Sequence, residues 1–279
     1  MPSRIYRIAK RLIVSAALTG ITDPRQLFEE LSGSDIVFFD VETTGLDQHE
    51  KQIIEIAAIR VDGSTLREKD KLHKKIKLTQ KTLKQIQEQK ENPSTLKKGE
   101  WGVEKVLEYT RYNKLNLPEE EEIKVLEEFK EFCEKSNAYL VAHNAKFDLK
   151  MIGTRIGKIK NLKVYDTMMF ARFFFIPSLT ALSKAGDEEA TDLLEKMKTS
   201  KGKVSSGLVY LGKGLGIDVS QAHSALADVQ TTIKVFKGIV DHFENKAESL
   251  ESEEYEKGRQ KAIMKERFYK QLDKKKKKR

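Results

Sequence analysis

Two acidic residues stand two positions apart at the end of an apolar run, in the stretch FFDVETTGL (residues 38–46). In an extended chain, residues two apart project from the same face, so the carboxylates of Asp40 and Glu42 converge. Converging carboxylates repel each other and raise each other's pKa unless a cation lies between them. A hard divalent ion such as Mg²⁺ or Mn²⁺ would satisfy them. Taken alone, however, the pair is more simply explained by acids that reach water at a strand end or cap the following turn.

Two later stretches add two acids and a histidine. In VAHNAKFDLKMI, Asp148 falls in the first turn of a predicted helix, where the helix N-terminus stabilises an anion. In HSALADVQTT, His223 precedes a predicted helix and Asp228 lies five residues later, inside that helix. A histidine before a helix is free to move, whereas the helix fixes the acid. Each placement is ordinary when it is taken alone.

Together, the three stretches follow the order Asp-x-Glu, Asp, His-x4-Asp, and this order resembles the DnaQ-like, or DEDDh, 3′–5′ exonuclease family. FDVETTGL resembles its first motif, HNAKFD its second and HSALAD its third. IIEIAAIRVDG and VYDTMMFAR also resemble the second strand of the family and a strand–helix unit between its motifs. The resemblance covers residues 35–243, interrupted by divergent stretches at about 80–118 and 185–206. It looks most similar to the proofreading branch of DNA polymerase III.

The resemblance implies a ribonuclease H-like fold and two divalent cations, Mg²⁺ or Mn²⁺, in the site. Asp40, Glu42 and Asp228 would bind the catalytic cation. Asp40 would bridge to the second cation, which Asp148 would support directly or through water. His223 would act as the general base that takes a proton from the attacking water, because an imidazole is partly unprotonated near neutral pH. All five side chains are present in this sequence.

The resemblance also implies a set of substrate-binding residues around the terminal nucleotide. The turn after Glu42 would offer backbone N–H groups or hydroxyls to the terminal sugar, and Leu46 would wedge against the last base. Core packing is the alternative for Leu46 and for Phe147, and Asp166 is expected to be a helix cap or a supporting group. The predicted substrate-binding residues are Val41, Thr43, Thr44, Gly45, Leu46, His143, Asn144, Phe147 and His223.

The activity implied is metal-dependent release of nucleoside 5′-monophosphates from DNA 3′ ends, in proofreading or repair. RNA 3′-end trimming by the same superfamily is the alternative, because discrimination of the sugar depends on one or two contacts to a 2′-hydroxyl. A non-catalytic interaction subunit is a remote third hypothesis, and a missing acid would have favoured it. The expected partners are a single-stranded or frayed nucleic acid 3′ end and a polymerase.

The apolar pattern predicts the elements that must position these residues. Apolar runs predict a meander of three strands followed by two shorter strands that alternate with helices, which indicates an α/β domain with a mixed sheet. The expected strands are 36–41, 53–61, 66–78, 139–142 and 164–165. The expected helices are 119–133, with Ile123, Leu126, Phe129 and Phe132 on its buried stripe, 147–156 with Asn144 as N-cap, a helix from Thr167, and 226–240.

Charge and length divide the rest of the chain. Residues 257–279 hold twelve Lys or Arg and two Asp or Glu, a local charge of +10, so the net charge of +9 leaves about −1 for the remainder. We expect 1–34 to be an N-terminal helical extension, 35–243 the exonuclease domain and 244–279 a charged, basic tail. The segment 257–279 could contact a nucleic-acid backbone. A solvated end without a dedicated partner and a localisation signal are the alternatives.

Two further features bear on the setting of the protein. Cys133 is the single cysteine, so an intramolecular disulfide is excluded, and a reducing, cytoplasmic setting fits. The basic and apolar pattern before residue 19 is expected to be a docking helix rather than a targeting segment. No apolar run approaches the roughly 18 residues of a membrane span, so no membrane association is expected.

Overall fold

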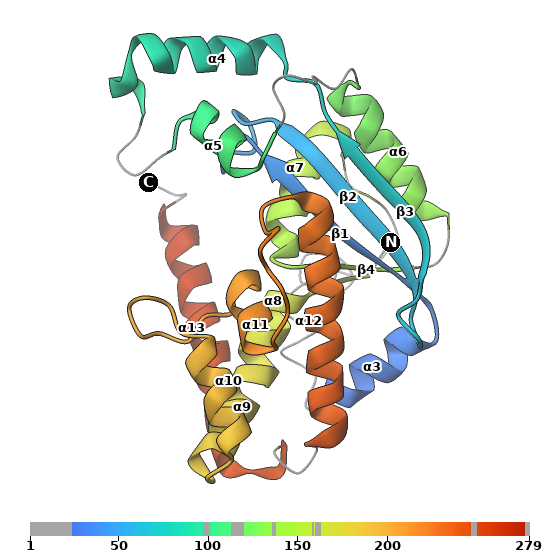
Figure 1. The fold of residues 1–279 in the computed structure, drawn as a ribbon, viewed down its shortest axis with the longest axis vertical. Coiled ribbons are helices and arrows are strands. Elements are labelled where there is room, and N and C mark those ends of the chain that lie inside the picture. The colour runs from blue at the N-terminus through green and yellow to red at the C-terminus, as the bar shows by residue number, and fades with distance from the viewer. Residues whose placement is uncertain are drawn as a thin grey trace, which may run out of the picture. The chain divides into compact units, whose positions relative to one another are not determined.

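The computed structural model describes residues 24–96, 101–112, 120–135, 138–157, 159, 163–246 and 250–276 (Figure 1). The chain divides into two compact units. The first, called the sheet unit, consists of Ser32–Tyr165 and Ser220–Thr232. The second, called the helical unit, consists of the described residues up to Leu31, Asp166–Val219 and those from Ile233 onward. The expected helix over the first 23 residues lies outside the described residues.

A five-stranded mixed sheet forms the centre of the sheet unit, in the order β3-β2-β1-β4-β5. β1 is antiparallel to β2, β2 is antiparallel to β3, and β1 is parallel to β4. The prediction of an antiparallel meander followed by parallel strands is therefore confirmed. The strands are β1 (Asp35–Thr43), β2 (Ile53–Asp62), β3 (Glu68–Lys75), β4 (Tyr139–Ala142) and β5 (Val164–Asp166).

Burial explains why the first two strands are so apolar. The run Ile36–Phe39 of β1 and nearly all of β2 are shielded from solvent on both faces, as expected for strands inside a sheet. β3 carries the sequence EKDKLHKK and lies at the edge of the sheet, where charged side chains discourage pairing with another chain. The centre of the sheet is thus a rigid support for whatever β1 carries.

The described helices of the sheet unit include α4 (Gln80–Glu91), α5 (Val103–Tyr109), α6 (Glu122–Glu134), α7 (Ala145–Ile156) and the first part of α12 (Ala225–Asn245). α6 packs against β2, β3 and α7, and α7 packs against β1 and β4. The predicted stripe on α6 is wrong at Ile123, which is exposed, because the buried face is shifted to include Val125 and Cys133. Cys133 is therefore a small core residue, as predicted.

The polar stretch 80–118, which gave no clear pattern, contains α4, the short 3-10 helix η1 (Pro93–Thr95) and α5. A few apolar residues suffice to anchor it. Val103, Leu107 and Tyr112 form one buried cluster with Ile54 and Leu78 of the neighbouring segments. The Tyr112 hydroxyl also donates a hydrogen bond to the carbonyl oxygen of Ile76, at 2.8 Å. The described residues of this segment, 80–96 and 101–112, therefore pack onto the sheet unit.

The helical unit packs around aromatic side chains. Phe28, Phe170 and Phe243 come from three distant parts of the sequence and pack in tilted and edge-to-face pairs, with ring centroids 5.3–6.4 Å apart. Ser178 and His242 are joined by a hydrogen bond of 2.8 Å. The elements are α3 (Pro24–Ser32), α8 (Thr167–Phe170), the π-helix η2 (Ala171–Phe175), α9 (Ile176–Lys184), α10 (Glu188–Lys196), α11 (Leu208–Gly214), the later part of α12 (Ala225–Asn245) and α13 (Glu253–Lys276).

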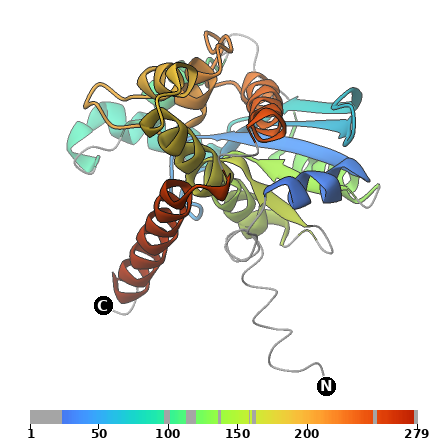
Figure 2. The same cartoon turned by 90° about the horizontal axis from the view of Figure 1, so that it is seen from below.

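The described part of the basic segment, up to Lys276, belongs to α13. α13 packs against α9 and η2, and it is the red helix in Figure 2. Tyr255, Arg259 and Ile263 of α13 are buried, and the Arg259 guanidinium lies 6.0 Å from the ring centroid of Phe174. Part of the charge assigned to the tail is therefore used in packing. Within the described ranges, no helix is both long and apolar enough to cross a membrane.

Candidate active site

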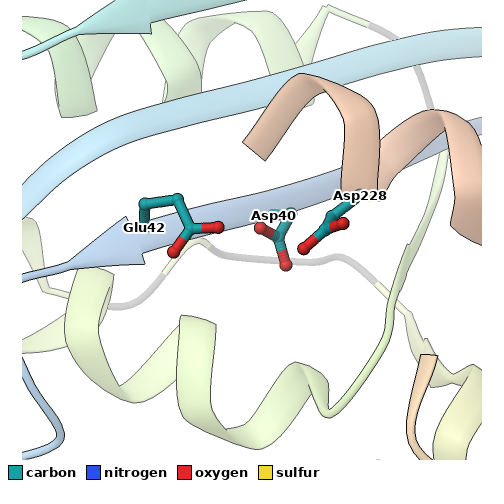
Figure 3. A group of neighbouring side chains, drawn as sticks. All are labelled: Asp40, Glu42 and Asp228. Carbon is teal, nitrogen blue, oxygen red and sulfur yellow. The ribbon is translucent and has the colours of Figure 1, made fainter. Parts of the chain in front are cut away.

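Three carboxylates meet at one face of β1. Asp40 and Glu42 come from β1, and Asp228 comes from α12, more than 180 residues later in the chain. One carboxylate oxygen of each residue lies within 4.8 Å of the others. Figure 3 shows the three side chains turned toward a common space between the strand and the helix. The convergence that the spacing of two residues predicts for Asp40 and Glu42 is therefore present, and Asp228 completes it.

The local structure explains why these side chains hold their positions. Asp40 and Glu42 lie opposite Ala57 and Glu55 of β2, and the ladder shifts register directly after Glu42. Asp228 lies in the first turn of α12, and its carboxylate accepts a hydrogen bond from the backbone N–H of His223, at 3.3 Å. A helix N-terminus favours an anion at this position.

Asp148 lies beside this group but is bound differently. It is buried in the first turn of α7, and its Oδ1 accepts a hydrogen bond from the backbone N–H of Val41, at 3.2 Å. That bond joins α7 to β1 between the two strand acids. Asp148 is not one of the three residues whose oxygens mutually approach within 4.8 Å, although its charge contributes to the raised pKa of Asp40 and Glu42.

Burial and mutual repulsion disfavour the ionised forms of the three carboxylates. Burial, followed by the charges of Asp148 and Glu42, raises the pKa of Asp40 well above its usual range. Burial and then the charge of Asp228 raise the pKa of Glu42 to about 8. Burial is also the main reason that the pKa of Asp228 rises to about 6. Raised pKa values in a group of acids are typical of a functional site.

The donor set fits a hard divalent cation. Among the described residues, Asp40, Glu42 and Asp228 form no ion pair with a lysine or arginine. Carboxylate oxygens are the ligands that Mg²⁺ and Mn²⁺ prefer, and a cation would offset the repulsion that raises these pKa values. The three residues would contribute ligand oxygens from two elements that are far apart in sequence.

The sequence analysis missed a fifth acid, Glu55. It lies on β2 directly opposite Glu42, is almost fully buried, and adds to the raised pKa of Asp40, Glu42 and Asp228. Its Oε1 accepts a hydrogen bond from the hydroxyl of Ser224, at 3.1 Å, and lies 2.8 Å from Nε2 of His73. The signal was available, because a lone acid interrupts the apolar run IIEIAAI.

His223 lies at the edge of this group in an unusual backbone conformation. Its φ is +74°, in the left-handed region that non-glycine residues rarely adopt and that is often found at functional sites. Its Nε2 is 2.5 Å from the hydroxyl of Tyr109, and the two rings lie 4.0 Å apart at 31°. Burial and the nearby charge of Arg111 lower the pKa of His223.

The turn that carries His223 is held from both sides. Arg111 donates one hydrogen bond to the carbonyl oxygen of Ser220, at 2.8 Å, and another to the side chain of Gln221. On the other side, Ser224 is bonded to Glu55. Tyr109 and Arg111 belong to the segment that the sequence analysis treated as a divergent insertion, so their roles had no signal in the motifs.

In the turn after Glu42, several of the groups predicted to bind the terminal sugar already form hydrogen bonds within the protein. The N–H and hydroxyl of Thr44 are both engaged with the backbone of Gln52, at 2.9 Å each. The Thr43 hydroxyl donates to the carbonyl oxygen of Gly45, at 2.7 Å. Gly45 has φ of +151°, and a Cβ there would lie 3.0 Å from the side chain of Lys51, so glycine is required.

The remaining predicted residues are distributed as follows. Leu46 is 84% exposed, so core packing does not explain it. Phe147 and His143 are partly buried, whereas Asn144 is exposed. Asn144 is the N-cap of α7 as predicted, but in a left-handed conformation (φ +73°) and without a side-chain capping bond. Asp166 is confirmed as a helix cap, since it accepts hydrogen bonds from the first N–H groups of α8.

The fold and the acid group agree with the comparison against known families. Residues 37–100 and 102–236 match the RNase_T family, which is described as an exonuclease family. The chain therefore belongs to the DnaQ-like exonuclease family.

Two curated relatives are DNA polymerase III PolC-type proteins of Staphylococcus. The chain is 31% identical over 211 residues to the one from Staphylococcus haemolyticus, and 30% identical over 209 residues to one from Staphylococcus aureus. Each match covers 74% of this chain but only 11% of the relative. The chain thus spans about a tenth of the length of the curated relatives that it matches.

Solved structures agree on the fold. Exonuclease I from E. coli in complex with a dT13 oligonucleotide superposes with a TM-score of 0.56 at 18% identity. The match covers 76% of this chain and 42% of that chain. A product-bound structure of exonuclease I gives a TM-score of 0.54 over 78% of this chain and 45% of that one, again at 18% identity. The ribonuclease H-like α/β fold expected from the sequence is therefore confirmed.

Proposed function

We propose that this chain is a divalent-metal-dependent 3′–5′ exonuclease that releases nucleoside 5′-monophosphates from DNA 3′ ends. The observation that carries the proposal is the group of three carboxylates, Asp40, Glu42 and Asp228, with oxygens within 4.8 Å of one another and without an ion pair among the described residues. In a chain of this family, such a group is best explained as the metal site of the nuclease.

The geometry of the group supports three proposed ligands, and the family resemblance implies a fourth acid and a second cation. Asp40, Glu42 and Asp228 would bind a Mg²⁺ or Mn²⁺ ion, and Asp148 would support a second ion beside Asp40. When bound, two such cations stabilise the charge that develops on the attacking and leaving oxygens of a phosphodiester. Because Asp148 already bonds to the N–H of Val41, it also fixes the strand that carries two of the ligands.

His223 is the proposed general base. Its lowered pKa keeps the imidazole neutral near pH 7, which is the form that can accept a proton from water. In the structure, Nε2 is bonded to the hydroxyl of Tyr109. The base must therefore exchange this hydrogen bond for one to the attacking water, and the turn that carries His223 must allow that change.

The proposed substrate is DNA, and two considerations support this choice. The relatives at 30–31% identity are named as DNA polymerase III proteins, and exonuclease I shares the fold in a complex with a DNA oligonucleotide. Leu46, exposed directly after Gly45, is the proposed apolar contact for the terminal base, and Phe147 on α7 is a second proposed substrate contact. A polymerase partner is proposed on the same grounds as DNA.

The test uses the purified chain with Mg²⁺ or Mn²⁺ and a single-stranded DNA labelled at its 5′ end. We expect a ladder of products shortened one nucleotide at a time from the 3′ end, with mononucleotides released, and no reaction in EDTA. Asp228→Asn should be inactive, whereas Asp62→Asn, a change of the same kind at an exposed turn, should be fully active. Endonucleolytic products, or equal activity of Asp228→Asn, would refute the proposal.

A matched RNA strand and a DNA duplex with a mismatched 3′ end complete the experiment. Faster degradation of DNA than of RNA supports the proposed substrate, and the opposite order would replace it with RNA trimming. Faster removal of a mismatched than of a matched terminal nucleotide supports a proofreading role, because a frayed end enters the site more readily.

A further inference from the structure

The segment 101–112 presents two different faces. On one face, Val103 and Leu107 are fully buried in the cluster that anchors the segment to the sheet unit. On the other, Trp101, Lys105 and Tyr109 recur at intervals of four residues and are exposed. Lys105 and Tyr109 lie one turn apart on α5, and Trp101 lies two residues before this helix begins. The segment therefore displays three neighbouring exposed side chains, and the proposed chemistry involves only the hydroxyl of Tyr109, through its hydrogen bond to His223.

The three side chains of this strip, called the aromatic strip, are in direct contact. The rings of Trp101 and Tyr109 meet edge to face, with centroids 5.0 Å apart. The ammonium group of Lys105 lies 4.7 Å from the centroid of Trp101. Trp101 is 44% and Tyr109 46% exposed, although large aromatic side chains are usually covered. Exposed aromatic residues packed together in this way are typical of a binding surface.

The aromatic strip leads to the group of carboxylates within the same unit. The ring of Tyr109 stacks on His223, and the backbone N–H of His223 donates to Asp228. Arg111, two residues beyond Tyr109, holds the turn before His223. The charges of Glu42 and Asp228 also raise the pKa of Tyr109, after the larger effect of burial. One end of the strip thus lies at the candidate active site.

We propose that Trp101, Lys105 and Tyr109 form a platform on which the bases of a single-stranded polynucleotide stack as its 3′ end enters the site. The inference rests on the proposed nuclease function. Aromatic side chains bind bases of any sequence through their faces, and a neighbouring cation contacts the phosphates. Lys105 is exposed, so its ammonium group can leave the face of the Trp101 ring and contact a phosphate oxygen instead. Glu108 is exposed on the same helix, so stacking rather than charge provides most of the binding.

The chain offers a direct probe, because Trp101 is its only tryptophan. The test titrates the full chain in EDTA, where no hydrolysis is expected, with oligothymidylate and follows tryptophan emission. The anisotropy of a fluorescein-labelled oligonucleotide measures binding independently. We expect the emission to be quenched over the same concentration range in which the anisotropy rises. Oligouridylate, tested in the same way, shows whether the platform also accepts RNA.

Substitutions then separate stacking from other effects. Trp101→Ala should weaken binding of the oligonucleotide about tenfold, and Trp101→Phe should retain most of it. Tyr109→Phe, which keeps the ring, should bind like the unchanged chain, whereas Tyr109→Ala should bind less well. The control is Leu83→Ala, which removes an equally exposed apolar side chain from α4 and should have no effect.

A substrate of one nucleotide distinguishes a loss of binding at the platform from a loss of hydrolysis at the active site. Trp101→Ala should hydrolyse the p-nitrophenyl ester of thymidine 5′-monophosphate at the normal rate with Mn²⁺, because this ester is too short to reach the platform. Binding without a change in emission, or normal binding by Trp101→Ala, would overturn the platform while leaving the nuclease intact. Absence of hydrolysis of both substrates by the unchanged chain would overturn the proposed function and the platform with it.

Discussion

The three carboxylates of the candidate site and Asp62, a single acid at the end of β2, lie in the same unit but in opposite environments. At the site, Asp40, Glu42 and Asp228 are crowded together, and their pKa values are raised. At the end of β2, Asp62 accepts hydrogen bonds from Ser64 and Thr65 and lies 3.2 Å from Lys69. These hydrogen bonds hold the pKa of Asp62 well below its usual range.

Asp62 is an acid whose ionised form stabilises the fold, whereas the ionised forms of the site acids destabilise it. Asp62 closes the turn between β2 and β3, and every one of its contacts favours the ionised form. For Asp40, Glu42 and Asp228, by contrast, burial and the charges of neighbouring acids both favour the protonated form. Proteins retain such arrangements where a ligand or a reaction requires them.

The largest expected effect is on catalysis. Asp40→Asn should reduce hydrolysis of a 3′-labelled oligonucleotide by about 10³-fold or more, because it removes a ligand charge at the centre of the group. The same change should raise the melting temperature in EDTA, because it relieves repulsion with the neighbouring acids. A fall in both activity and melting temperature would show that Asp40 supports the fold instead.

The second effect is stabilisation by metal. Adding Mn²⁺ at about 100 times its Kd should raise the free energy of unfolding by about 2.7 kcal/mol, since the ion binds only the folded site. Thermal denaturation with and without EDTA measures this change. Asp228→Asn should lose most of the effect, whereas Asp62→Asn should keep it. An equal response of both variants would place the ion elsewhere.

The third effect is a dependence of the free energy of unfolding on pH, which has opposite signs for the site acids and for Asp62. The folded pKa values of Glu42 (about 8) and Asp228 (about 6) lie above their usual values, so the folded chain binds more protons than the unfolded chain between about pH 4 and 8. The free energy of unfolding without metal should therefore fall as the pH rises through this range. The lowered pKa of Asp62 acts in the other direction, and its contribution is lost as the pH falls below about 4.

Urea denaturation in EDTA at pH 5 and pH 8.5 checks the sign. Glu42→Gln should flatten the dependence, because the glutamine cannot lose a proton. Asp62→Asn is the matched control and should leave the slope between these two pH values unchanged. Increasing stability toward pH 8.5 would contradict the raised pKa values.

A smaller effect is expected at Glu55, which combines the two types of environment. Glu55 is buried like the site acids, but it is bonded to Ser224 and His73. Ser224→Ala removes the bond that joins β2 to the turn of His223 and should lower kcat about tenfold. Because no proposed ligand is removed, the Mn²⁺ dependence of the melting temperature should persist. A loss of metal binding instead would assign Ser224 a direct part in the metal site.

The smallest effect is expected at Asp62. Asp62→Asn should lower the melting temperature slightly and leave the activity unchanged, because the turn keeps most of its hydrogen bonds and lies outside the site. Parallel melting and activity measurements test this expectation. A marked loss of activity would remove the distinction between structural and site acids on which the comparison is based.

The spacing of residues predicted part of this arrangement. A separation of two on a strand fixes a shared face, so the convergence of Asp40 and Glu42 was predictable from local geometry. The approach of Asp228 was not, because it depends on the packing of α12, and only the order of the motifs indicated it. Glu55 was missed for a related reason: its position opposite Glu42 depends on the β1–β2 register, which the sequence does not state.

The polar segments were the least predictable part of the fold. α4 is almost entirely polar, and α5 is held by two buried residues in seven, too few to give a clear periodicity. The same reason explains Ile123, since an apolar residue near a helix end can belong to either face. Tertiary contacts with the sheet, rather than local propensity, decide these elements.

The packing of α13 has a consequence for protein engineering. Deleting the chain after Glu256 would remove Arg259 and Ile263, which are buried in the helical unit, together with the positive charge. A truncated protein that failed to bind nucleic acid would therefore have lost a structural helix as well as a polycation. Replacing the lysines of 274–278 by glutamine changes the charge and retains these buried residues. Substitution of these lysines therefore tests the role of the positive charge without removing a structural helix, which truncation would do.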